Sequence, residues 1–234
     1  MPLTVLAALL LAAPALAQSA SDTLDAPPRF VGRANVIVAG LGGSLLLPEA
    51  GFGREIGGRH GGGRAFFGAQ ATPRLAFGLD VASYRVSAHE ETVTLPSGPQ
   101  LEVETSTDVA RIGVFGRYGP RVGPIHAYGE ALVGITVVMT QTALAGRSEA
   151  DAPAETQRTD AAPSAGLGAG AEYEFRELPV AVHVRAQYVR GGTARFLIFD
   201  PEAGAFTERT SGTSAGSLTV GLTYNFFRAR PLDP

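Results

Sequence analysis

The chain has 234 residues, 45% of them hydrophobic, with 30 glycines, 16 prolines and neither cysteine nor tryptophan. This length suits one domain or two small ones, and the lack of cysteine excludes disulfides, thiolate metal sites and cysteine nucleophiles. All 19 basic residues are arginine, and a formal net charge of −3 leaves no broad basic surface for nucleic acid. A mean hydropathy of +0.12 argues against a bundle of transmembrane helices.

The first segment has the features of an export signal. Residues 3–17 are an apolar run that ends in Ala15-Leu16-Ala17, the pattern of a cleavage site. As a helix this run would rise only about 22 Å, which is short of the roughly 30 Å hydrocarbon core. We therefore predict a signal peptide over 1–17 and a short extension over 18–29. The alternative is a buried N-terminal helix.

From there on, apolar residues alternate with polar or small ones in runs of about ten residues. In 217–226, for example, every second residue from Leu218 to Phe226 is large and apolar. The first run is apolar on both faces, so its phase is ambiguous. We predict eight strands, over 33–47, 64–71, 75–82, 110–118, 125–139, 165–175, 180–188 and 217–226.

The connections between these strands alternate in length. Tight turns with proline or glycine are expected at 71–74, 119–124 and 176–179. Long gaps lie near 46–62, 88–107, 142–162 and 196–213, and the Pro- and Ala-rich stretch 150–163 suggests a mobile loop. Because every second connection is long, the pattern predicts an up-and-down barrel with all long loops on one rim.

Alternation alone also fits a soluble barrel with an apolar interior. Here, however, the polar face carries charges on most strands, and the aromatic residues of the apolar face gather beside the short turns, where a membrane interface would lie. We therefore predict a lipid-facing apolar exterior. The interface aromatics would be Phe77, Tyr118, Tyr173, Phe175, Tyr224 and Phe226. The interior polar network would be Arg64, Asp80, Arg111, Arg117, His126, Glu130, Glu172, Glu174, His183 and Arg185.

The export signal, the eight alternating runs, the three short turns and the four long gaps cover residues 30–227. Together they resemble the small outer-membrane β-barrel family, the OmpA- and OmpX-like group. The stretch 218–226 is similar to the C-terminal strand that this family presents to the barrel-assembly machinery. The resemblance implies an eight-stranded antiparallel up-and-down transmembrane β-barrel with short periplasmic turns and long extracellular loops. The barrel would cover 30–228 and a C-terminal tail 229–234.

An eight-stranded barrel is just wide enough for side chains to fill it, and buried ions need partners. The interior carries four arginines and four carboxylates, which predicts a lumen plugged by salt bridges. The positions of the short turns predict which of these residues are neighbours. Glu172 should lie opposite His183, with Arg185 one step further along the strand. His126 should lie near Arg117, Glu130 near Arg111, and Arg64 diagonal to Asp80.

Two groups of residues invite a chemical hypothesis. His126, Glu172, Glu174 and His183 could bind zinc or act as general acid and base, or they could belong to the structural network. Ser87, His89, Glu90 and Glu91 lie near the outer rim, but neighbouring strand residues point to opposite faces, which suits a catalytic triad poorly. We expect no catalytic residues, no metal and no cofactor.

The gap at 88–107 is acidic, with Glu90, Glu91, Glu102, Glu104 and Asp108 near or within it. These residues could recruit divalent cations, or they could simply form a solvated loop.

The sequence favours a monomeric outer-membrane barrel with a plugged lumen that anchors four surface loops, and not an enzyme. Its partners would be outer-membrane lipid and the assembly machinery, with no nucleic acid and an unknown surface ligand. The alternatives are a narrow channel for small solutes or ions and, third, a lipid-modifying enzyme.

Overall fold

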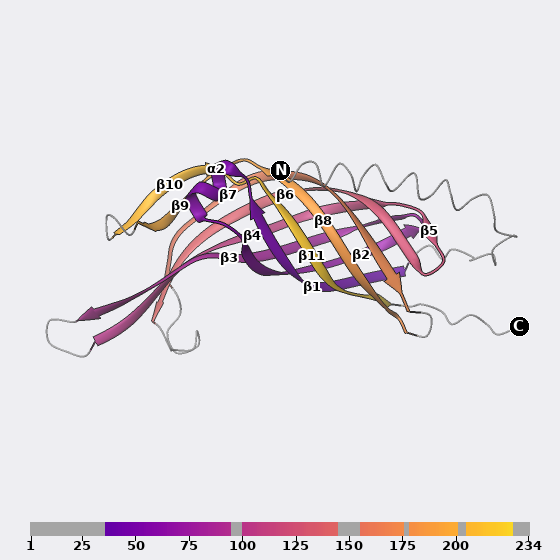
Figure 1. Ribbon diagram of the computed structural model, residues 1–234, viewed down its shortest axis with the longest axis horizontal. Coiled ribbons are helices and arrows are strands. Elements are labelled where there is room, and N and C mark those ends of the chain that lie inside the picture. The colour runs from indigo at the N-terminus through magenta and orange to yellow at the C-terminus, as the bar shows by residue number, and fades with distance from the viewer. Residues whose placement is uncertain (1–35, 95–99, 145–154, 176–177, 201–204, 227–234) are drawn as a thin grey trace, which may run out of the picture.

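The computed structural model describes residues 36–94, 100–144, 155–175, 178–200 and 205–226. Eight long antiparallel strands close into a barrel (Figure 1). In order around the barrel they are β1 (Val36–Pro48), β2 (His60–Thr72), β3 (Leu75–Thr94), β4 (Gln100–Tyr118), β6 (Ile125–Leu144), β7 (Glu155–Glu174), β8 (Val180–Gly191) and β11 (Ala215–Phe226). The barrel closes because β11 pairs with β1, from Ile37 opposite Phe226 to Pro48 opposite Ala215. The predicted eight-stranded up-and-down barrel is confirmed.

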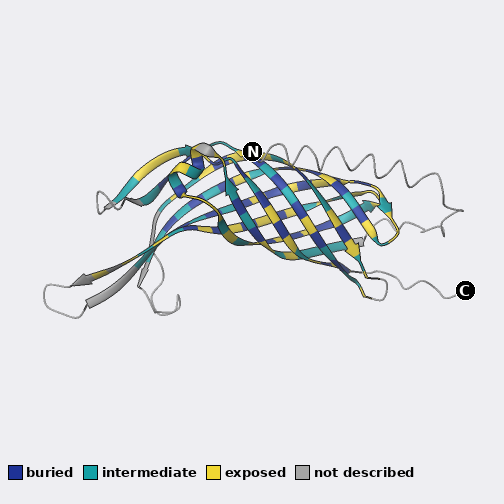
Figure 2. Cartoon of the chain, in the orientation of Figure 1, coloured by how far each residue is buried: buried dark blue, intermediate teal, exposed yellow. Residues whose placement is uncertain are grey.

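Buried and exposed residues alternate along each strand and form stripes around the barrel (Figure 2). The stripes follow from strand geometry, since successive side chains point to opposite faces of a sheet. The ambiguous phase of β1 is now fixed. Ser44 and Leu46 are buried inside, whereas the side chain of Leu41 is 69% exposed on the outside.

The short turn between β4 and β6 differs from the prediction. A two-residue strand, β5 (Arg121–Val122), continues the register of β4, with Tyr118 opposite Gly129 and Arg121 opposite His126. The chain therefore reverses at Gly123 and Pro124 rather than over the whole of 119–124. Gly123 has a φ of +58°, a conformation that glycine adopts without steric cost.

Two of the four loop predictions, at 88–107 and 142–162, are wrong, because the described residues of these segments form strands. β3 and β4 remain paired up to Thr94 opposite Gln100, and β6 and β7 up to Thr142 opposite Glu155. Of the expected mobile loop over 150–163, residues 150–154 lie outside the described residues and 155–163 are strand. These outer ends, 85–94, 100–108, 139–144 and 155–159, form a strand extension. Figure 1 shows β3 and β4 projecting far beyond the end of the barrel opposite β5.

The other two gaps also contain structure. Helix α2 (Ala50–Ile56) lies between β1 and β2, and the hairpin of β9 (Thr193–Asp200) and β10 (Ala205–Gly212) lies between β8 and β11. Both lie at the end of the barrel from which the strand extension projects (Figure 1).

Within the described part of the chain, no helix is long and apolar enough to cross a membrane. The predicted signal peptide over 1–17, the extension over 18–29 and the tail over 229–234 lie outside the described residues.

Candidate functional site

The outer face of the barrel is apolar over its whole circumference. On β6, for example, Ile125, Val133 and Ile135 are 49%, 57% and 45% exposed. The predicted interface aromatics also face outward, and two pairs of them make edge-to-face contacts: Tyr173 with Phe175 at 5.5 Å and Tyr224 with Phe226 at 4.7 Å between ring centroids. All six lie within a few residues of a strand end, at the end of the barrel that carries the short turns.

Six buried side chains form a continuous chain of ion pairs across the interior, which we call the charge chain. Positive and negative groups alternate along it. Its members, in order, are Glu172, Arg117, Glu130, Arg185, Asp80 and Arg64. The N···O distances are 3.1 Å for Glu172–Arg117 and 2.7 Å for Arg117–Glu130, Arg185–Asp80 and Asp80–Arg64, while Arg185 Nη2 also contacts Glu130 Oε1.

The charge chain connects strands that are not neighbours in the sheet. Asp80 lies on β3 and Arg185 on β8, which are separated by four steps in either direction around the ring of eight strands. Gln187 adds a crosslink, because its amide NH₂ donates to Glu130 at 2.9 Å and its carbonyl accepts from Arg64 at 2.9 Å. These ion pairs and hydrogen bonds offset part of the cost of burying the charges.

Aromatic rings surround one end of the charge chain. The guanidinium carbon of Arg117 lies 4.3, 4.5 and 4.8 Å from the ring centroids of Phe66, Phe115 and Tyr128, which are distances of cation–π contact. Sequence reasoning missed this cage. The signal was present, because Phe66, Phe115 and Tyr128 occupy the polar phase of their strands.

Glycines on the inward face provide the room for these rings. A Cβ atom on Gly40 would overlap the ring of Phe66, and one on Gly170 would lie 2.5 Å from Tyr128 Oη. By contrast, a Cβ atom on the outward-facing Gly43 would meet nothing within 4 Å.

The structure bears out some predicted neighbours and corrects others. Glu172 lies opposite His183 in register, and Arg64 pairs with Asp80, as the turn geometry predicts. The predicted pairing of Glu130 with Arg111 is wrong, because Glu130 lies opposite Arg117. The prediction treated 119–124 as the turn, which shifted the register of β6 by four residues.

The hypothetical metal or acid–base group does not converge. His126 Nδ1 lies 3.8 Å from Glu172 Oε2, but Glu174 pairs with Arg121 at 2.7 Å and His183 Nδ1 lies 3.1 Å from Thr223 Oγ1. Within the described ranges, no three histidine, aspartate or glutamate side chains are arranged to hold a metal.

The outer-rim candidates for catalysis are also dispersed. The ring of His89 packs against Phe206 of β10, with 6.3 Å between the centroids. Glu90 is exposed on the opposite face of β3. Of the acidic residues around 88–107, Glu104 and Asp108 both pair with Arg85, at 3.2 and 3.4 Å.

The outer half of the interior is largely apolar. Helix α2 and strand β9 insert side chains into the mouth of the barrel, and Phe52 meets Phe196 edge to face with 5.8 Å between ring centroids. Both are 1% exposed. This apolar plug consists of Leu46, Phe52, Ile56, Ala82, Tyr84, Val86, Val109, Val138, Ala162, Ala194, Phe196 and Ala215.

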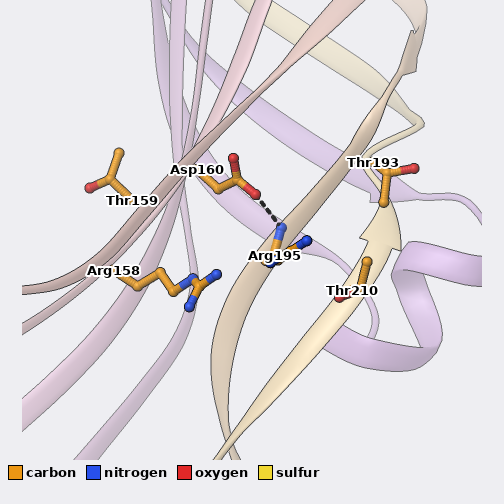
Figure 3. Close-up of a pocket in the computed structure, with 6 residues that line it drawn as sticks. All are labelled: Arg158, Thr159, Asp160, Thr193, Arg195 and Thr210. Atoms are coloured by element: carbon orange, nitrogen blue, oxygen red, sulfur yellow. Dashed lines mark hydrogen bonds between the residues drawn. The ribbon is translucent and has the colours of Figure 1, made fainter.

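An open cleft lies at the outer rim, between the end of β7 and the β9–β10 hairpin (Figure 3). Its lining is polar: Arg158, Thr159, Asp160, Thr193, Arg195 and Thr210. The backbone N–H groups of Arg195 and Ala161 donate to the carboxylate of Asp160 at 2.8 and 2.9 Å, and these bonds lower the pKa of Asp160. Arg158 pairs with Glu208 at 2.7 Å, so the cleft carries no strong net charge.

Several solved outer-membrane proteins are similar to this chain. Neisserial surface protein A is 14% identical, with 83% of this chain and 99% of that protein covered and a TM-score of 0.44. OprG from Pseudomonas aeruginosa is 15% identical, with 83% and 97% covered and a TM-score of 0.44. A major outer membrane protein from Thermus thermophilus is 12% identical, with 81% and 99% covered and a TM-score of 0.47. No family model and no curated protein matches the chain.

Proposed function

We propose that this protein is a monomeric outer-membrane barrel with a closed lumen, whose role is to hold the strand extension, helix α2 and the β9–β10 hairpin at the cell surface. The observation that carries the proposal is the inversion of the barrel, which buries charged residues inside and exposes apolar ones outside. A protein in water exposes no continuous apolar belt of this kind unless another phase covers it.

The dimensions of the belt support a bilayer as that phase. On β6 the exposed apolar residues run from Ile125 to Ile135. Ten steps at about 3.4 Å each give roughly 34 Å along the strand, and a tilt near 40° reduces this to about 26 Å across the membrane. The apolar band of outer-membrane barrels is about 25 Å tall.

Two barriers in series support a closed lumen. The charge chain crosses the interior from wall to wall, and the apolar plug fills the outer mouth. The plug also gives the surface role its scaffold, because α2 and β9 are fixed to the barrel by buried side chains. The outer-membrane lipid and the barrel-assembly machinery are the partners that this role requires, and it requires no catalytic group.

Two measurements test the proposal. Spin labels placed one at a time from Leu218 to Phe226 should alternate, with labels at outward positions accessible to oxygen in the lipid. A purified barrel in a planar bilayer should show no steady current. Labels that report water on the apolar face would exclude the membrane location, and steady open currents would favour the narrow-channel alternative.

A further inference from the structure

The buried charges of the lumen do not balance. The charge chain contains three arginines and three carboxylates, and Glu174 is paired with Arg121 near the short turns. Arg111 remains. It is 5% exposed, and no ion pair joins it to a carboxylate of the described residues. The lumen therefore carries one buried guanidinium beyond its carboxylates.

The contacts of Arg111 do not compensate this charge. Its Nη2 donates to the backbone oxygen of Thr213 at a long 3.3 Å, and its Nε is buried without a hydrogen-bond partner among the described residues. Asp80, on the neighbouring strand, already accepts from Arg64 and Arg185. An uncompensated buried cation is among the costliest groups in a protein interior.

A second unsatisfied donor lies beside it. Thr136 is directly opposite Arg111 in the β4–β6 register, so their Cβ atoms are roughly 5 Å apart. Its side chain is fully buried, and its hydroxyl has no partner in the described part of the chain. The residues on either side at this level are small, Ala82 on β3 and Ala162 on β7.

We propose that Arg111 and Thr136 form a binding site for a small monovalent anion of the halide class, chloride in the cell. The guanidinium supplies the charge, while its Nε–H and the threonine hydroxyl donate to the ion. A halide suits the site because it is small and accepts hydrogen bonds from any direction. The site lies between the charge chain and the apolar plug and is independent of what the surface structures bind.

The test uses the purified barrel in detergent, with sodium chloride exchanged for sodium gluconate at constant ionic strength. A ligand that binds only the folded state stabilises it in proportion to the logarithm of its concentration above the dissociation constant. The thermal midpoint of the native protein should therefore rise with chloride but not with gluconate. Arg111→Gln should remove the chloride dependence, and Thr136→Val should move it to higher chloride concentrations.

Arg85→Gln is the matched control, because Arg85 is 60% exposed and pairs with Glu104 and Asp108 on the strand extension. It should keep the full chloride dependence. Identical midpoints in chloride and gluconate for the native protein would overturn the proposal, and so would a dependence that survives Arg111→Gln.

A structural measurement covers the case in which Arg111→Gln fails to fold. Crystals of the native protein grown in sodium bromide should show an anomalous peak beside Arg111 and Thr136, and crystals of Thr136→Val a weaker one. A native crystal with no peak there, or with bromide only at the surface, would overturn the proposal.

Discussion

The two halves of the interior are filled by opposite chemistry. Toward the short turns, the lumen holds the charge chain, in which each ion is paired with an opposite charge on another strand. Toward the outer mouth, it holds the apolar plug, in which α2 and β9 contribute two of the three aromatic rings, Phe52 and Phe196. The first half is built only from residues of the barrel wall, so it stabilises the barrel as a whole. The second half depends on inserted segments, so it fixes those segments to the barrel.

The largest effect should come from the centre of the charge chain. Arg185→Ala leaves Asp80 and Glu130 buried without a shared partner, and breaking a buried ion pair in this way costs about 3–5 kcal/mol. Urea unfolding in lipid vesicles, followed by circular dichroism, measures this loss. Arg158→Ala is the control, since its pair with Glu208 is partly exposed and should contribute less than about 1 kcal/mol. Equal losses in the two variants would show that the charge chain does not hold the walls together.

The apolar plug should respond locally. Phe52→Ala removes a ring that is 1% exposed, and a truncation of this kind costs about 3–5 kcal/mol of packing. Helix α2 should then open at least about a hundred times more often, since 1.4 kcal/mol corresponds to a factor of ten. Trypsin should cleave after Arg54 and Arg59 faster by a similar factor. Phe67→Ala, which truncates a 55% exposed outward ring, should leave the cleavage rate unchanged, and an unchanged rate in Phe52→Ala would refute the anchoring role of the plug.

The aromatic cage tests how tightly the inner half is packed. Gly40→Ala places a methyl group against the ring of Phe66, and overpacking of a core costs about 1–3 kcal/mol. Gly43→Ala on the same strand has open space around the new atom and should be neutral or slightly stabilising. The difference in urea midpoint between these two variants isolates the interior clash, and its absence would mean that the cage adapts freely.

The smallest effect should lie where the two halves meet. The hydroxyl of Ser44 is 2.9 Å from both Tyr84 Oη, in the apolar plug, and Thr219 Oγ1, opposite Arg185. Ser44→Ala should lower the free energy of unfolding by about 1 kcal/mol, the typical net worth of a hydrogen bond. Ser83→Ala, on the exposed face of β3, provides the baseline in the same urea titration. No difference from that baseline would indicate that the halves are not coupled through Ser44.

The strands were predicted correctly from the sequence in the region where a bilayer would require apolar residues on one face only. In the spanning part of most strands, outward positions are apolar and most inward positions are polar or small, so strands and faces can be read from the sequence, as for Arg64 and Asp80. Beyond the spanning part, the sequence of β3 and β4 loses this alternation. The Thr- and Glu-rich outer ends of β3 and β4 therefore resembled a loop.

The sequence prediction missed the apolar plug and misplaced the β4–β6 register, and these two errors have different causes. Phe52, Ile56 and Phe196 were visible as apolar residues inside two predicted loops, a signal that should have indicated a second core. The β4–β6 register could not be read from composition, because Gly119-Pro120 and Gly123-Pro124 are equally good turn sequences. Only the backbone, with Gly123 at a positive φ, shows which pair reverses the chain.

The strands that close the barrel carry no charge. Neither Val36–Pro48 nor Ala215–Phe226 contains an acidic or basic residue, whereas every member of the charge chain lies on β2, β3, β4, β6, β7 or β8. The pairing of the first strand with the last is thus stabilised only by backbone hydrogen bonds and neutral side chains. The ions lie on the other strands, and Asp80 on β3 meets Arg185 on β8 only across the lumen. Curling of the sheet therefore brings these ions together, whereas pairing of the two edge strands dehydrates no charged group.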